Sequence, residues 1–328
     1  MMALMNKLIK ARVYRSAKRE FLVKCLETGE FLTSCAMGNL LKHEENIVVG
    51  DYVEIEATDG SQGTHIVSVA PRANEIYRMI IREGKKKVIA SNCDLLVILS
   101  SCSRPEFKRG IVDRYLARAH QWGIKTAIVF NKMDEYDASL FSDGLQFECD
   151  RLKNLGVETF EISALDPNYK LQFLPRGIEE LKSALKGRTA ILVGQSGVGK
   201  SKTISALCGG NVELKTHAVS KVGKGSHTTT WAEIVDWGDF TMIDSPGVRS
   251  FSLDDIPQDQ LLSFFPDIEE LATCCKFSNC KHEDNSKGCA FWADRDLDSY
   301  ETRLIHSRLE SFKRINEEVC SIPQWQKK

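Results

Sequence analysis

Long apolar runs are absent from this 328-residue chain. No stretch approaches the roughly 20 consecutive apolar residues that a helix needs to cross a bilayer. The first ten residues carry basic side chains but no uninterrupted apolar stretch before a small-residue cleavage site, so they do not resemble a secretory signal. Internal repeats and low-complexity tracts are missing as well, which excludes solenoids and arrays. These absences predict a globular protein with no membrane partner. The 11 cysteines are an odd number, and four of them sit beside a histidine at ligand-like spacing, which suits a reducing compartment better than a disulfide scaffold, so we expect the protein to be cytoplasmic.

The chain also lacks an excess of charge of either sign. Its 44 Lys and Arg residues face 45 Asp and Glu residues, for a formal net charge of -1. Bulk charge therefore predicts no nucleic-acid partner, and any such surface must come from local clustering. Within a connector at 71–92, residues 78–87 hold one cluster, in which Arg78, Arg82 and Lys85 to Lys87 accompany a single Glu83. Two interpretations of this connector stay open, a solvated linker and a strip that contacts phosphates.

The hydrophobic pattern divides the chain into three parts. Residues 10–70 read as about five short strands between turn signals, which favours a small barrel; the OB-fold is the leading candidate and an SH3-like barrel the alternative. From 93 to 250, apolar strands alternate with helical stretches, as in a parallel sheet covered on both faces. A Cys/His segment and a helical stretch follow. We expect a β-barrel at 1–72, an α/β domain at 73–250 and a helical metal-binding domain at 251–328.

The strongest motif is a glycine-rich loop between an apolar strand at 189–193 and a helical stretch. It comprises Gly194, Gln195, Ser196, Gly197, Val198, Gly199, Lys200 and Ser201, followed by Lys202. Glycines let the backbone curl until successive N–H groups point at phosphate oxygens, at a helix N-terminus whose dipole favours negative charge. In this pattern Lys200 reaches the β- and γ-phosphates, and the Ser201 hydroxyl binds Mg²⁺. The loop predicts a nucleoside triphosphate site in which Lys200 is catalytic.

A second motif predicts which base is bound. The strand at 126–130 closes in Asn131, Lys132, Met133 and Asp134. Guanine has two donors on one edge, N1–H and N2–H₂, and the carboxylate of Asp134 can accept both, whereas adenine presents no such pair. We expect Asn131 to tie this loop to the base and to the phosphate loop, and the stem of Lys132 to cover the ring.

Two shorter motifs complete the expected site. Ser163 and Ala164 follow the strand at 157–162 and are positioned to offer a backbone N–H to guanine O6. The strand at 240–243 runs into D-S-P-G, whose Asp244 can hold Mg²⁺ through a water while the Gly247 N–H meets the γ-phosphate.

The order of these motifs resembles that of a known family. N-K-M-D comes first, then S-A-L, the phosphate loop, G-S-H-T-T-T at 225–230 and D-S-P-G, whereas ordinary GTPases begin with the phosphate loop. With the barrel before it and the Cys/His segment after it, this order resembles the circularly permuted small-ribosomal-subunit biogenesis GTPases of the RsgA/YjeQ family. Ser226 stands where that family usually has arginine.

The resemblance implies a function and partners. It implies a cytoplasmic GTPase that binds the 30S subunit late in maturation, has low intrinsic activity and is stimulated by the subunit. It also implies an amino-terminal OB-fold in contact with rRNA. The alternative is an RNA-binding module whose affinity for RNA is switched by the bound nucleotide and whose GTP hydrolysis is incidental. We expect a monomer.

Hydrolysis needs a group that orients the attacking water, and the position after Gly247 does not supply one. Many GTPases have glutamine there, but Val248 can neither donate nor accept a hydrogen bond. His227 is the candidate instead, because it adjoins Thr228, Thr229 and Thr230, one of which should complete the Mg²⁺ shell. An exposed loop histidine without a catalytic role is the alternative.

The Cys/His segment predicts a structural zinc site. Cys275, Cys280, His282 and Cys289 follow the spacing C-x4-C-x-H-x6-C. Three thiolates and one imidazole form a closed tetrahedral set that leaves no position for a reacting water. Cys274 is a rival first ligand, but Cys275 fits the x4 spacing.

Overall fold

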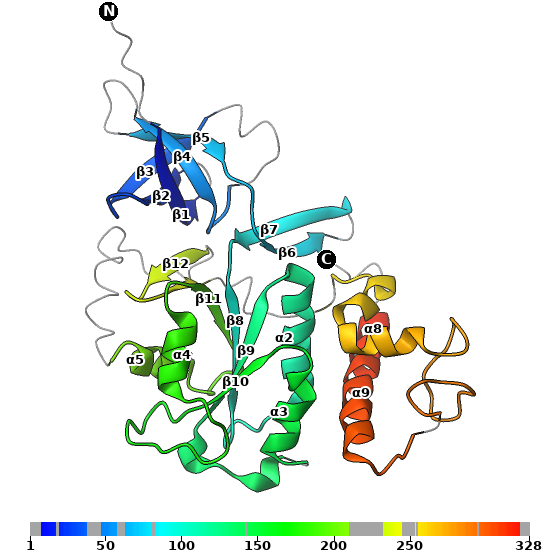
Figure 1. The fold of residues 1–328 in the computed structure, drawn as a ribbon. Helices are drawn as coiled ribbons and strands as arrows, with labels where there is room; N and C mark the ends of the chain where they lie inside the picture. The colour runs from blue at the N-terminus through cyan, green and yellow to red at the C-terminus, as the bar shows by residue number, and fades with distance from the viewer. Residues whose placement is uncertain are drawn as a thin grey trace, which may run out of the picture.

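The computed structural model describes residues 8–17, 20–37, 47–57, 63–80, 83–141, 143–209, 232–244, 253, 255–293 and 295–321. Figure 1 shows a β-barrel, an α/β core next to it and a helical region beside the core. Within these ranges no helix combines the length and the apolar character needed to cross a membrane.

Five strands form the barrel: β1 (Ile9–Ala17), β2 (Glu20–Cys25), β3 (Phe31–Ala36), β4 (Tyr52–Ala57) and β5 (Thr64–Val69). β1 pairs with both β2 and β4, β2 pairs with β3, and β5 lies between β3 and β4, so the sheet closes in the order 1-2-3-5-4-1. This is a Greek-key barrel of the OB type. Its core includes Val13, Val23 and Ile55, which have no exposed surface. The OB-fold prediction is confirmed.

A two-stranded antiparallel ribbon follows the barrel, made of β6 (Glu75–Ile80) and β7 (Lys85–Ser91). The sequence predicts an irregular connector here, because three consecutive lysines obscure the alternation of β7. The ribbon forms because Ile76 packs into the hydrophobic core of the α/β region. The Trp122 indole also donates a hydrogen bond to Tyr77 O, at 3.0 Å. The lysines themselves are exposed.

The core sheet has six strands in the order β10-β9-β8-β11-β13-β12. All are parallel except β12, which runs antiparallel to β13. The strands are β8 (Leu95–Ser101), β9 (Lys125–Asn131), β10 (Glu158–Glu161), β11 (Thr189–Val193), β12 (Glu233–Asp236) and β13 (Thr241–Asp244). The predicted strands lie within one or two residues of these bounds wherever the chain is described.

Helices cover both faces of this sheet (Figure 1). They are α2 (Arg109–Trp122), α3 (Leu145–Lys153), α4 (Ile178–Leu185) and α5 (Lys200–Leu207), with short 3-10 turns η2 (Met133–Glu135) and η3 (Ala138–Leu140). Alternate residues of β8 point to opposite faces: Leu96 and Ile98 pack with α2 and α3. Leu95 and Val97 pack with α4 and α5. Both faces are buried, which explains why the parallel strands read as continuous apolar runs.

The barrel and the core share one sheet. β1 pairs with β12 at Arg15 and Glu233, which extends the sheet to eleven strands, and the same two side chains form an ion pair at 2.8 Å. Arg12 donates to Thr189 Oγ1 at 2.7 Å, at the start of β11. The sequence gives no sign of this junction, because the segments that make it are far apart in the chain. Besides these polar contacts, Tyr14 of β1 and Val49 are buried in the same apolar cluster as the core strands.

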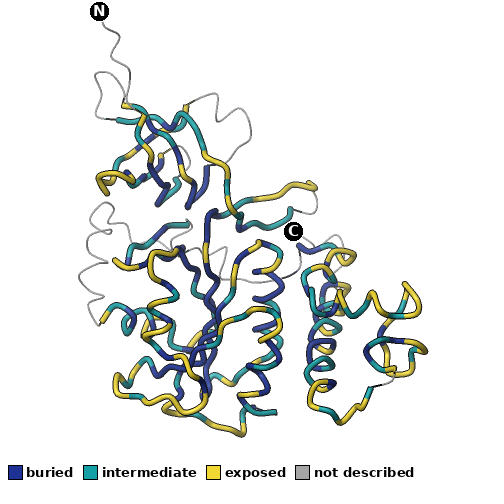
Figure 2. The backbone as a smooth tube through the Cα atoms, in the orientation of Figure 1, coloured by how far each residue is buried: buried dark blue, intermediate teal, exposed yellow. Residues whose placement is uncertain are grey.

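The C-terminal region consists of η4 (Gln258–Gln260), η5 (Leu262–Phe264), α8 (Pro266–Thr273), a Cys/His loop and α9 (Tyr300–Ser321). It has its own apolar cluster, centred on Phe265, Phe291 and Leu309, which also takes in Ala117 of α2. Figure 2 shows buried residues both in the central strands and along α9. The helical stretch expected after the Cys/His segment is α9.

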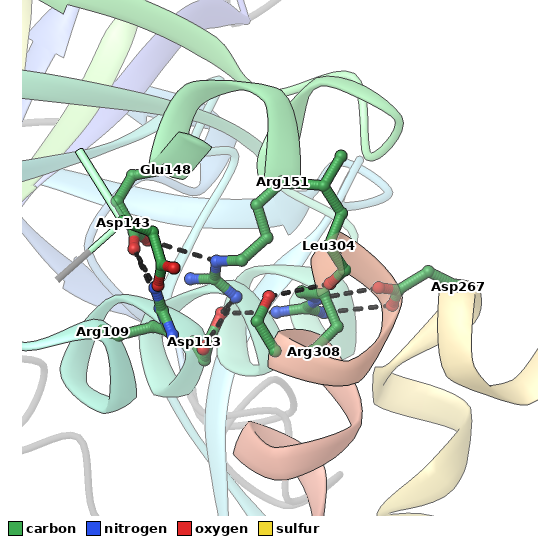
Figure 3. A network of polar contacts seen from close by, with 9 residues as sticks. Arg109, Asp113, Asp143, Glu148, Arg151, Asp267, Leu304 and Arg308 are labelled. Carbon is green, nitrogen blue, oxygen red and sulfur yellow. Dashed lines mark hydrogen bonds and ion pairs between the residues drawn. The ribbon is translucent and has the colours of Figure 1, made fainter. Parts of the chain in front are cut away.

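Ionised side chains bridge the C-terminal region and the core (Figure 3). Asp113 of α2 pairs with Arg151 of α3 at 3.0 Å and with Arg308 of α9, which reaches Asp267 of α8 at 2.7 Å. Asp113 has no exposed surface, and the side chain of Arg308 is 4% exposed. Burial alone would raise the pKa of Asp113, but Arg151 and Arg308 outweigh it and hold the pKa below its ordinary value. We call Asp113, Arg151, Asp267 and Arg308 the helix-junction network.

Candidate functional site

The glycine-rich loop connects the end of β11 to the start of α5, as the motif requires. Gly194 has φ 146°, and a Cβ there would lie 2.2 Å from Leu99 O. Gly199 has φ 98°, and its Cβ would lie 2.5 Å from Asn131 Nδ2. Any other residue at these two positions would be strained and would clash. The tight course of the loop therefore depends on its glycines.

Lys200, Ser201 and Asp244 line one cavity of about 530 Å³ beside this loop, together with Gly194 and Ser196. The Lys200 ammonium donates to Gly194 O at 2.7 Å and to Gln195 O at 2.8 Å. Asp244 ends β13, which pairs with β11 and so brings its carboxylate to the edge of the sheet where the loop begins. A cation, a hydroxyl and a carboxylate thus line one cavity beside the phosphate loop.

Asn131 ties three loops together. Its Nδ2 donates to Val198 O in the phosphate loop at 2.8 Å, and its Oδ1 accepts from Ala164 N at 3.0 Å. The side chain is almost wholly buried. One amide therefore fixes the spacing between the base-reading loop (131–134), the phosphate loop (194–201) and the S-A-L turn (163–165).

Asp134 is held by the S-A-L turn. The Ser163 hydroxyl donates to Asp134 Oδ1 at 2.6 Å and accepts from Asp166 N at 3.2 Å. The neighbouring Met133 is buried and donates from its backbone to Ile162 O at 3.2 Å. Lys132 has φ 62° and donates to Arg104 O. The base-reading residues and the turn after β10 thus form one hydrogen-bonded unit.

A second cavity, of about 580 Å³, lies beside this unit. Its walls include Ser163, Ala164, Leu165 and Tyr169, with Lys202 from α5 across from them. The two cavities share no lining residue: one lies beside the phosphate loop and the other beside the turn that contains Ser163 and Ala164. His227, Thr228, Thr229, Thr230 and Gly247 lie outside the described residues, as do Ser226 and Val248. The roles assigned to the site residues stay predictions.

One polar residue near the site is not anticipated by the motifs. Glu161, the last residue of β10, has no exposed surface and accepts hydrogen bonds from the loop that follows the S-A-L turn. β10 reads E-T-F-E, so Glu161 looks like an ordinary acid at a strand end and the sequence gives no signal of its role.

The Cys/His loop brings together Cys275, Cys280, His282 and Cys289. Their ligand atoms all lie within 4.8 Å of one another. His282 Nδ1 is 3.5 Å from Cys275 Sγ and 3.7 Å from Cys289 Sγ. Zinc bonds of about 2.3 Å to sulfur and about 2.0 Å to nitrogen in a tetrahedron give edges of roughly 3.5–3.8 Å, so this donor set fits. The four residues form a cluster that could hold a metal ion.

Contacts around the cluster orient its ligands. Trp292 Nε1 donates to His282 O at 2.9 Å, and Ala290 N donates to Cys275 Sγ at 3.4 Å. Burial and the nearby Lys313 lower the pKa of His282, which favours the neutral imidazole that binds metals. Cys274 is exposed and lies outside the cluster, with its Sγ 3.9 Å from Glu270 O. Of the two rival first ligands, Cys275 is the one placed with the others.

The strand that ends in the base-reading loop precedes the strand that ends in the phosphate loop, yet both lie side by side with β8 in one parallel sheet. This arrangement defines a circularly permuted GTPase. A family model described as RsgA GTPase matches residues 69–254. The chain belongs to this family, which confirms the resemblance seen in the motif order.

Relatives and solved structures agree with this assignment. A small ribosomal subunit biogenesis GTPase RsgA of Flavobacterium psychrophilum is 32% identical over 315 residues, 93% of this chain and 91% of the relative. A protein of the same name from Pseudomonas aeruginosa is 36% identical over 282 residues, 85% of this chain and 76% of its own length. YjeQ from Thermotoga maritima superposes with a TM-score of 0.70 at 26% identity, over 96% of this chain and 99% of YjeQ.

Proposed function

We propose that this protein is a GTP hydrolase stimulated by the small (30S) ribosomal subunit and acting late in the maturation of that subunit. The observation that carries the GTP assignment is Asn131, whose one side chain links the base-reading loop, the S-A-L turn and the phosphate loop. The ribosomal partner is supported by the relatives, which are named for small ribosomal subunit biogenesis.

The site residues have separate roles in this proposal. Asp134 accepts from guanine N1–H and N2–H₂, and Lys200 neutralises charge on the β- and γ-phosphates. Ser201 and, through a water, Asp244 would hold Mg²⁺, with one of Thr228 to Thr230 completing its shell. A bound ion would supply positive charge against the phosphate oxygens. Gly247 N–H meets the γ-phosphate.

The wider assignments follow from the same family. The three domains are residues 1–72, 73–250 and 251–328, and the protein is cytoplasmic and monomeric. The barrel binds rRNA in this proposal, and it presents two accessible aromatic side chains: Phe31 is 43% exposed and Tyr52 is 38% exposed. Exposed aromatic rings are suited to stacking with unpaired bases.

The decisive test is GTP turnover with and without purified 30S subunits. We expect low turnover alone, because Val248 cannot orient the water, and an increase of at least about tenfold with the subunit. Phosphate release is measured under conditions of excess GTP, with 50S subunits as the control. If 30S subunits bind in a nucleotide-dependent manner without raising phosphate release, the nucleotide-switched RNA-binding module is the better description.

The same assay examines His227. A group that positions the water acts in the transition state, so His227→Ala should lower 30S-stimulated turnover by about tenfold or more while leaving nucleotide affinity nearly unchanged. Unaltered turnover would remove His227 from the mechanism.

We further propose that the Cys/His cluster holds one structural zinc ion. A cluster closed by three cysteines and a histidine stabilises a segment too small for a large core of its own. Cys280→Ser should lower the zinc content from about one equivalent per chain to near zero and reduce the melting temperature of the protein. Metal analysis and thermal unfolding measure both. Cys274→Ser is the matched control, because it changes the exposed neighbour outside the cluster. Full zinc content in Cys280→Ser would contradict the proposal.

A further inference from the structure

Glu161 forms an unusually complete set of hydrogen bonds for a buried carboxylate. It ends β10 and has no exposed surface. Its Oε1 accepts from the Tyr169 hydroxyl at 2.5 Å and from Gln172 N at 2.6 Å. Its Oε2 accepts from Phe173 N at 2.8 Å and from Leu174 N at 2.6 Å. All four donors belong to the loop that leaves the S-A-L turn, so one side chain fixes the far end of that loop.

This loop forms part of the wall on the base side of the site. Tyr169 and Leu171 line the same cavity as Ser163 and Ala164. The Phe173 ring lies 4.7 Å from the ring of Tyr136, which follows the base-reading residues by two positions. The loop held by Glu161 therefore touches both motifs that surround the expected guanine.

The two ends of the loop are held by different groups. At its start, Ser163 bonds to Asp134 and Asp166 N. Backbone bonds from Ile162 N to Phe130 O and from Met133 N to Ile162 O fix the strand end behind Ser163. From Tyr169 to Leu174, the four donors instead converge on Glu161. Asp134 therefore keeps its support without Glu161, whereas residues 169–174 would lose the four hydrogen bonds that the carboxylate accepts.

We propose that Glu161 is a positioning residue for guanine recognition. By holding residues 169–174, it fixes the part of the cavity wall next to the S-A-L turn, on the side where a backbone N–H of that turn is expected to meet guanine O6; this rests on the guanine site proposed above. An ionised carboxylate suits the task because it only accepts, and all four of its partners donate. Glutamine has nearly the same shape, but it would turn an NH₂ group toward backbone N–H groups and release part of the loop.

The proposal predicts that Glu161 affects the contact with guanine O6 and not the contact of Asp134 with N1–H and N2–H₂. Three ligands allow the two contacts to be measured separately. GDP has O6 and the N2 amine. 6-Thio-GDP keeps both donors to Asp134 but replaces O6 with sulfur, a weak acceptor. Inosine diphosphate keeps O6 and lacks the N2 amine. The GDP to 6-thio-GDP affinity ratio therefore reports the O6 contact, and the GDP to inosine diphosphate ratio reports the contact with Asp134.

The test is calorimetric titration of the full-length protein and Glu161→Gln with these ligands. We expect Glu161→Gln to weaken GDP by about tenfold and 6-thio-GDP by much less, so that their ratio falls toward one. The GDP to inosine diphosphate ratio should change less than about threefold, because Asp134 keeps its own support. Tyr169→Phe, which removes one donor and keeps the carboxylate, should shift the first ratio in the same direction by a smaller factor and remains usable if Glu161→Gln does not fold.

Glu148→Gln is the matched control. Glu148 is also a buried carboxylate, but it pairs with Arg109 and Arg151 away from the base loops, so both ratios should stay as in the unmodified protein. If Glu161→Gln and Tyr169→Phe weaken GDP and 6-thio-GDP by the same factor, Glu161 only stabilises the fold and the proposal is overturned. If the unmodified protein fails to discriminate GDP from inosine diphosphate, the guanine-site assignment itself is wrong.

Discussion

Asp134→Asn is expected to weaken GTP and GDP binding by about 10²–10³-fold and to give the protein a preference for xanthine nucleotides. The carboxylate accepts two hydrogen bonds from guanine, and the amide that replaces it accepts only on its oxygen. The hydrogen bond from Ser163 determines the orientation of that amide. Its hydroxyl accepts from Asp166 N and so donates its own proton to Asp134 Oδ1, at 2.6 Å. The same donation to asparagine leaves the NH₂ group facing the base, where xanthine offers a carbonyl in place of the amine of guanine.

The measurement is the ratio of xanthosine to guanosine diphosphate affinity in the variant and in the unmodified protein. Asp137→Asn is the matched control: the same change at an exposed carboxylate that caps η3 through Ser139, which should leave the ratio unchanged. ATP should remain a poor ligand of both proteins, because adenine lacks the N1–H donor. An Asp134→Asn variant that still prefers guanine would show that Asp134 does not read the base.

The site could be predicted largely because its signals are local. A glycine-rich loop between an apolar strand and a helix has few alternative structures, and the positive φ values of Gly194 and Gly199 are what that spacing demands. The core strands could also be predicted from the sequence. β8, for example, is buried on both faces, so its first five residues are all apolar. The motif order was sufficient to indicate the permutation and the family.

What the sequence did not reveal depends on contacts between distant segments. Glu161 reads as an ordinary acid at a strand end, and its partners become visible only once residues 169–174 fold back over it. The lysines of β7 hide the alternating pattern of the β6–β7 ribbon. The pairing of β1 with β12 cannot be predicted either, because it involves a single pair of residues. The helix-junction network is equally hidden, since Asp113 and Arg308 are 195 positions apart. Charge alone marks such residues as solvent-exposed; only tertiary packing buries and pairs them.

Arg308→Met is expected to lower the free energy of unfolding by about 3–5 kcal/mol, the usual cost of removing one partner from a buried ion pair. The variant keeps an apolar side chain of similar length in α9, but it leaves Asp267 without this arginine and Asp113 with Arg151 as its remaining partner in the network. Arg303→Met is the matched control on the same helix. The Arg303 side chain is 49% exposed and pairs with Asp143 at the surface. Such a pair contributes at most about 1 kcal/mol.

The contribution of the helix-junction network to stability should also depend on pH. The pKa of Asp113 lies below its unfolded value of about 4, so its contribution to stability is present above that pH and is lost as the pH falls through the lower folded value. Removing Arg308 takes away one of the two cations that depress this pKa, and acid unfolding should therefore begin at a higher pH in Arg308→Met than in Arg303→Met. Chemical unfolding at neutral pH and an acid titration followed by circular dichroism measure the two effects. Equal stability of the two variants would mean that the helix-junction network contributes no more than a surface ion pair to the stability of the protein.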